Sequence, residues 1–167
     1  MRYRFMRFPG GKAKALTLSY DDGVVQDKRF SDVLEKYGIK CTFNLNGINC
    51  RKNKGLSFDE VREYILSRGN EVAVHGLNHR AEGYLRPIEG IHDVLECRLE
   101  LESELGVIIR GMAYPDTGIT RYSNGANYET VKDYLKKLDI TYARTLGGDN
   151  NAFEMPSDFY EIGRAHV

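Results

Sequence analysis

The sequence lacks the features that would direct it to a membrane, to nucleic acid or to export. No apolar run among its 167 residues approaches the length that a transmembrane helix needs. Its 24 basic and 24 acidic residues cancel, so no excess of positive charge favours nucleic acid or an anionic membrane surface. No apolar signal segment follows the basic N-terminal residues. The sequence therefore predicts a cytoplasmic protein that partners neither nucleic acid nor a membrane.

Cysteine is also scarce. Cys41, Cys50 and Cys97 are an odd number and contain no Cys-x-x-Cys pair, which favours reduced, buried thiols over a disulfide framework. The chain has the length of one domain, and it contains no internal repeat, low-complexity tract or linker. We therefore expect a single domain with a substantial core.

Strand-like and helix-like segments alternate along the chain. Runs of β-branched and aromatic residues predict strands, and apolar residues at helical spacing predict the helices between them. The predicted strands are residues 15–20, 39–45, 71–75, 107–113 and 140–143, and the predicted helices are residues 30–37, 57–65, 91–105 and 128–138. The Asn-rich segment 46–55 is predicted to be a loop. Short connections between such elements predict βαβ units and a parallel sheet.

The first predicted strand ends in two adjacent carboxylates. Asp21, Asp22 and Gly23 are consistent with an ordinary turn, because Asp and Gly are common turn formers. They are also consistent with two acids at the C-terminal end of a strand, where α/β proteins keep their active sites. This stretch alone leaves both interpretations open.

Two histidines follow the third predicted strand. His75 and His79 are four residues apart, so a helical turn leading out of the strand would aim both imidazoles at one point. Because parallel strands end on the same side of a sheet, we expect this pair to meet Asp21 and Asp22. Two imidazoles and one carboxylate suit Zn²⁺, and the second carboxylate would be free to take a proton from water.

The loop after the fourth predicted strand, residues 110–118, contains Tyr114 and Pro115. Considered alone it is a turn that begins at a proline. Considered with the other two motifs, it is a third loop on the same rim of the sheet.

The order of these three motifs resembles that of the polysaccharide deacetylase family, the NodB-like carbohydrate esterases of family four. Residues 19–23, Ser-Tyr-Asp-Asp-Gly, resemble the Thr-Phe-Asp-Asp-Gly motif of that family, and residues 38–43 resemble its second strand. The resemblance covers roughly residues 15–145. It implies a distorted (β/α) barrel, and the five predicted strands would make that barrel incomplete.

The resemblance also implies the chemistry. It makes Asp21 the general base and makes Asp22, His75 and His79 the ligands of a divalent metal, with Zn²⁺ expected. A backbone N–H in the loop after the fourth strand, near Tyr114 to Asp116, would stabilise the oxyanion. The implied function is a metal-dependent hydrolase that removes acetyl groups from N-acetylated or O-acetylated sugars or glycans. The alternatives are an amidase acting on a small cyclic amide or ureide, and an inactive carbohydrate-binding relative.

The chain departs from the family pattern at three places. Gly76 replaces a Ser or Thr after the first histidine, and Ala113 stands where the family has an arginine. Arg110 is then the nearby arginine expected to reach the base. The late histidine that serves the family as general acid has no counterpart, because His92 lies within a predicted helix and His166 lies in the last seven residues.

Residues 161–167 are expected to be non-native. Glu-Ile-Gly-Arg-Ala-His-Val back-translates naturally to a common sequencing adapter read in frame. We therefore expect one native domain over residues 1–160 and a gene that continues past about Phe159. The sequence predicts no oligomeric state.

Overall fold

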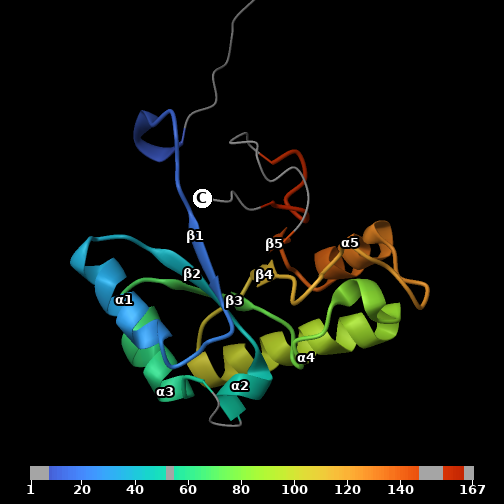
Figure 1. Ribbon diagram of the computed structural model, residues 1–167, viewed down its shortest axis with the longest axis horizontal. Coiled ribbons are helices and arrows are strands. Elements are labelled where there is room, and N and C mark those ends of the chain that lie inside the picture. Colours follow the sequence, from blue (N-terminus) through green and yellow to red (C-terminus); the bar gives the residue numbers. More distant parts are fainter. Residues whose placement is uncertain (1–7, 52–54, 147–155, 164–167) are drawn as a thin grey trace, which may run out of the picture.

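The computed structural model describes residues 8–51, 55–146 and 156–163, and a parallel sheet of five strands lies at its centre. The strands lie side by side in chain order. They are β1 (Leu18–Asp21), β2 (Cys41–Leu45), β3 (Glu71–Val74), β4 (Gly111–Ala113) and β5 (Tyr142–Arg144). The sheet curls into half of a barrel (Figure 1), which confirms the predicted α/β class and the incomplete barrel.

The helices form an arc around the outer face of the sheet (Figure 1). No labelled helix covers the opposite side, along which β1 runs. The helices are α1 (Asp27–Lys36), α2 (Gly47–Arg51), α3 (Phe58–Glu60), the π-helix η2 (Val61–Leu66), α4 (Pro87–Leu105) and α5 (Tyr128–Lys137). Two short 3-10 turns, η1 (Pro9–Gly11) and η3 (Glu82–Tyr84), complete the set. The Ser57–Glu60 capping box starts α3, because each side chain accepts the other residue's backbone N–H.

The hydrophobic core fills the space between the sheet and this arc of helices. Phe43, Leu45 and Met112 from the strands meet Leu101 and Leu135 from the helices, and all are fully buried. The three cysteines are buried free thiols, as the sequence predicts. The core therefore lies between the sheet and the helices, and its fully buried strand residues come from β2 to β5.

Most predicted boundaries differ from the structure by a few residues, and two predicted segments differ in kind or by more. The segment 46–55 was expected to be a loop, but it contains the helix α2, which is tied to the rest of the fold by a hydrogen bond from the Ile48 N–H to the Leu77 carbonyl (3.2 Å). The fourth strand was expected from residue 107, but it begins at Gly111 and Ile108 is 75% exposed. Tertiary contacts override local pattern in both segments.

The β5 edge of the sheet pairs with a later segment of the chain. Residues 159–162 run beside β5, where the Ala143 N–H donates to the Phe159 carbonyl (2.8 Å) and the Ile162 N–H donates to the Ala143 carbonyl (3.0 Å). Ile162 belongs to the suspected adapter sequence, whose residues 164–167 lie outside the described residues, so that hypothesis stays a prediction.

No helix in the described parts of the chain is long and apolar enough to cross a bilayer.

Candidate metal centre

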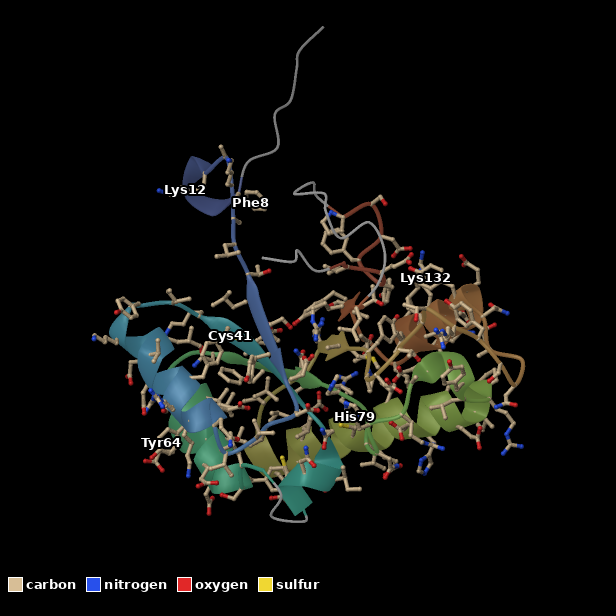
Figure 2. All side chains as sticks on the ribbon, in the orientation of Figure 1. Phe8, Lys12, Cys41, Tyr64, His79 and Lys132 are labelled. Carbon is tan, nitrogen blue, oxygen red and sulfur yellow. The ribbon has the colours of Figure 1, made fainter. Side chains whose placement is uncertain are left out.

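Asp22, His75 and His79 converge at the carboxyl ends of β1 and β3. The Asp22 Oδ1 lies 3.3 Å from the His79 Nε2 and 3.6 Å from the His75 Nε2. One ligand atom from each residue can be chosen so that all lie within 4.8 Å of one another. Two ligands about 2.0–2.1 Å from one tetrahedral Zn²⁺ lie about 3.3 Å apart, so these spacings match a shared ion. Figure 2 shows His79 close to the end of β1.

His75 is oriented for metal binding by the strand next to it. Its Nδ1 lies 2.9 Å from the Ala113 carbonyl oxygen at the end of β4, which requires Nδ1 to carry the proton and donate it. The Nε2 is then an acceptor directed at Asp22, the arrangement in which an imidazole binds a metal. Burial lowers the pKa of His75, which keeps the ring neutral. The donor set and its orientation therefore fit a divalent metal.

The loop that carries His79 is not the helical turn that the four-residue spacing predicts. The chain bends through residues 76–80, with left-handed backbone at Gly76 (φ +72°) and at His79 (φ +54°). Asp22 is also left-handed (φ +81°). Left-handed backbone at a residue other than glycine is strained and persists where surrounding contacts enforce it, often at functional sites. Two of the three candidate ligands carry such strain.

Asp21, the other acid of the pair, is held by side chains from β2 and β5. The Arg144 Nη2 donates to both carboxylate oxygens of Asp21 (2.5 and 2.6 Å), and the Asn44 Nδ2 donates to Oδ1 (2.8 Å). The Ser19 Oγ accepts from the Arg144 Nε (3.0 Å) and from the Asn44 Nδ2 (2.8 Å). Arg144 thus joins β5 to β1 across the open side of the half-barrel.

Arg110, expected to reach Asp21, lies elsewhere. It precedes β4 and is exposed, and its carbonyl accepts the Thr141 N–H (2.8 Å), so it lies at the amino end of the sheet. The arginine that contacts Asp21 is Arg144, which the sequence analysis did not name. No local pattern singles it out, because it lies 123 residues from its partner.

Tyr114 is 1% exposed, and its hydroxyl donates to the Tyr160 carbonyl oxygen (2.9 Å). Burial raises the pKa of this phenol well above its usual value. The Tyr114 N–H is donated to the Arg144 carbonyl (2.9 Å), and Pro115 has no N–H. In the turn that follows, the N–H groups of Asp116 and Thr117 have no acceptor among the described hydrogen bonds, and Asp116 is the exposed one of the two, with φ +50°.

Three asparagines in and just after β2 contact the two acids through their side chains. Asn44 and Asn46 are each 1% exposed, and Asn46 lies 3.4 Å from the Asp22 Oδ1 through its Nδ2. The Asn49 Nδ2 donates to the Asp22 carbonyl (2.9 Å), and its N–H donates to the Asn46 Oδ1 (3.0 Å). The sequence signal for these residues is three amides at the end of a buried strand and in the segment that follows it.

The acids face a cavity of about 920 Å³ inside the half-barrel. Its wall runs along β1 and includes Asp21, Asp22 and Arg144, with Leu16 and Phe159 at its margin. Solvent and a ligand of moderate size therefore have access to both carboxylates.

Replacing Arg144 by glutamine is expected to lower the free energy of unfolding by about 1–3 kcal/mol, because Asp21 loses two charged hydrogen bonds while remaining partly solvated. Denaturant unfolding measures this change. Arg110→Gln is the matched control, with an expected change of less than about 0.5 kcal/mol. An equal effect of the two substitutions would contradict the assignment of Arg144.

The chain was compared with protein families, curated proteins and solved structures. The family model described as "Polysaccharide deacetylase" matches residues 8–143. No curated protein matches the chain.

Several solved structures have a similar fold. The deacetylase PplD of Streptococcus pyogenes, in complex with acetate, is 18% identical with a TM-score of 0.77, over 96% of this chain and 67% of that one. A de-N-acetylase from Aggregatibacter actinomycetemcomitans is 18% identical with a TM-score of 0.73, over 93% of this chain and 71% of that one. A CE4 family pseudoenzyme from Bacillus anthracis is 18% identical with a TM-score of 0.63, over 78% of this chain and 42% of that one.

Proposed function

We propose that this chain, which belongs to the polysaccharide deacetylase family, hydrolyses N-acetyl or O-acetyl groups of a sugar or glycan with the help of a divalent metal. The observation that carries the proposal is the cluster of Asp22, His75 and His79, with Asp21 fixed beside it. Zn²⁺ is the expected ion, because the nitrogen and oxygen donors suit it. When bound there, the ion would polarise the acetyl carbonyl and acidify water.

Asp21 acts as the general base. Its carboxylate is the acid of the pair that does not join the cluster, and Arg144 and Asn44 hold both of its oxygens in place. A base that is fixed before the reaction can take the proton of the attacking water without reorganising. Arg144 and Asn44 are positioning residues in this proposal, and Arg110 has no part in it.

The Asp116 N–H supports the oxyanion of the tetrahedral intermediate. The Tyr114 N–H is committed to the Arg144 carbonyl, whereas the N–H groups of Asp116 and Thr117 have no acceptor among the described hydrogen bonds. Asp116 is the more exposed of the two, so its N–H is the donor proposed for the oxyanion. Tyr114 contributes through its buried hydroxyl to the support of the loop, in contact with the Tyr160 carbonyl.

An inactive carbohydrate-binding relative is the second candidate. The observation that favours it is the lack of a further histidine near the acids in the described part of the chain, where the remaining one, His92, is exposed on α4. His166 lies outside the described residues. If the protein is active, Asp21, which has taken the proton of the attacking water, is the group in the described part of the chain that can pass this proton to the leaving amine or alcohol.

The test uses the zinc-loaded protein with three substrates: N-acetylglucosamine oligomers, acetylated xylan and a cyclic ureide such as hydantoin. Acetate release from either glycan, lost on chelation and restored by Zn²⁺, is the expected result. A carbamoyl product from the ureide would favour the amidase. Saturable binding of the oligomers without acetate would favour the inactive relative.

A further inference from the structure

Asp93 is a buried carboxylate in the middle of α4, and its hydrogen bonds and ion pair in the described structure are made to the loop that carries His79. Its exposed fraction is 0%. Its Oδ2 accepts the Leu77 N–H (2.8 Å), and its Oδ1 accepts the Asn78 Nδ2 (3.2 Å). Arg80 forms an ion pair with the same Oδ1 at 3.7 Å. Burying a carboxylate is costly unless it is well bonded, so these contacts account for its position.

Gly76 leaves the space that the Asp93 carboxylate occupies. A Cβ placed on Gly76 would lie 2.8 Å from the Asp93 Oδ2 and 3.2 Å from the Pro115 Cγ. A residue with a side chain would displace the carboxylate from the Leu77 N–H, and its backbone would be strained at φ +72°. The Asp93 carboxylate thus packs closely against the backbone of Gly76, in the loop that joins β3 to His79.

The same contact determines where His79 lies. The chain must turn sharply between His75 and His79 to bring both Nε2 atoms to the Asp22 Oδ1, and it does so through left-handed backbone at Gly76 and His79. The loop has few backbone bonds of its own, apart from the Leu77 carbonyl that accepts the Ile48 N–H. The Asp93 carboxylate, which accepts the Leu77 N–H from outside the loop, therefore keeps the strained turn in one conformation.

We propose that Asp93 is a positioning residue for the metal-ligand loop, which it holds through Leu77 and Asn78 in the conformation that brings His79 to Asp22. The inference rests on the proposed function, because it concerns the same three ligands. Asp93 touches neither metal nor substrate in this proposal and acts through the backbone of the loop. Residues that support metal ligands contribute about 10–100-fold to metal affinity.

The first test needs no metal. In the apo protein, Asp93→Asn is expected to speed hydrogen exchange of the Leu77 N–H by about tenfold, because a neutral amide oxygen is a weaker acceptor than a carboxylate and the amide offers one acceptor oxygen where the carboxylate offers two. Exchange in β2 is expected to stay unchanged. Glu96→Gln, an exposed acid on the same helix, is the control and should leave the loop unchanged. Unchanged exchange at Leu77 in Asp93→Asn overturns the proposal.

The second test is a Co²⁺ titration followed by absorbance. Asp93→Asn is expected to weaken Co²⁺ binding by about tenfold or more in the folded protein. If Asp93 were only a packing residue, the free energy of unfolding would fall and the Co²⁺ affinity of the folded protein would not. Wild-type protein that binds no Co²⁺ contradicts the proposed function, and the exchange experiment still decides the role of Asp93.

Two glycine substitutions keep the proposal testable if Asp93→Asn does not fold. Gly76 and Gly106 have nearly the same backbone, with φ +72° and +69°, but no atom lies within 4 Å of a Cβ placed on Gly106. Gly76→Ala is expected to weaken Co²⁺ binding by about tenfold or more, and Gly106→Ala is expected to leave it unchanged. Equal effects of the two would show that backbone strain, and not the Asp93 contact, matters.

Discussion

Replacing His75 by alanine is expected to weaken zinc binding by more than about 100-fold, because even residues that only support metal ligands contribute 10–100-fold. His75 supplies one of three donors, and its Nδ1 bond to the Ala113 carbonyl directs the other nitrogen at Asp22. Calorimetric titration with Zn²⁺ measures the effect. His92→Ala is the control, because His92 is exposed on α4 and is not one of the three candidate ligands.

A second variant separates loss of a ligand from loss of the fold. His75 is 3% exposed, so its removal also leaves a cavity and an unpaired carbonyl. The His79 side chain is 39% exposed, and His79→Ala is expected to weaken zinc binding comparably with a much smaller change in the free energy of unfolding. Zinc affinity near the wild-type value in both variants would remove the basis for the metal site.

Exchanging the two adjacent acids for amides is expected to produce opposite defects. Asp21→Asn should lower kcat for acetate release by about 10²–10⁴-fold, the usual contribution of a general base, while zinc remains bound. Asp22→Asn should instead lose zinc, because an amide is a weaker ligand than a carboxylate. Acetate release and zinc content, measured on the same preparations, distinguish the two. The same defect in both variants would contradict the separate roles.

The positions of Arg144 and Asn44 explain why Asp21 and Asp22 differ. Asp21 is occupied by charged and amide donors from β5 and β2. Asp22, one residue later, turns away in a left-handed conformation and meets the two imidazoles instead. Adjacent carboxylates thus enter two environments because the strand ends between them. Asp21 is the last residue of β1, and Asp22 is the first beyond it.

Much of the fold follows from local pattern. Capping at Ser57 and the alternation of β-formers with helical stripes predict the order of strands and helices, and the structure confirms that order. The helix α2 escaped prediction because its sequence, Gly-Ile-Asn-Cys-Arg, has no helical periodicity. Its position is set by contact with Leu77 in the loop after β3.

Sequence motifs alone predict that Asp21, Asp22, His75 and His79 lie together at one rim of the sheet, and the structure places them there. The physical reason is that parallel strands in chain order end on the same side, so residues at strand ends need no further information to converge. The side chains that hold these four residues in place are identified by the folded structure and not by any motif. Arg144 reaches Asp21 because the curled sheet brings β5 opposite β1, and Asp93 reaches Leu77 because α4 passes beneath the loop. Such contacts depend on curvature and on helix placement, which local sequence patterns do not encode.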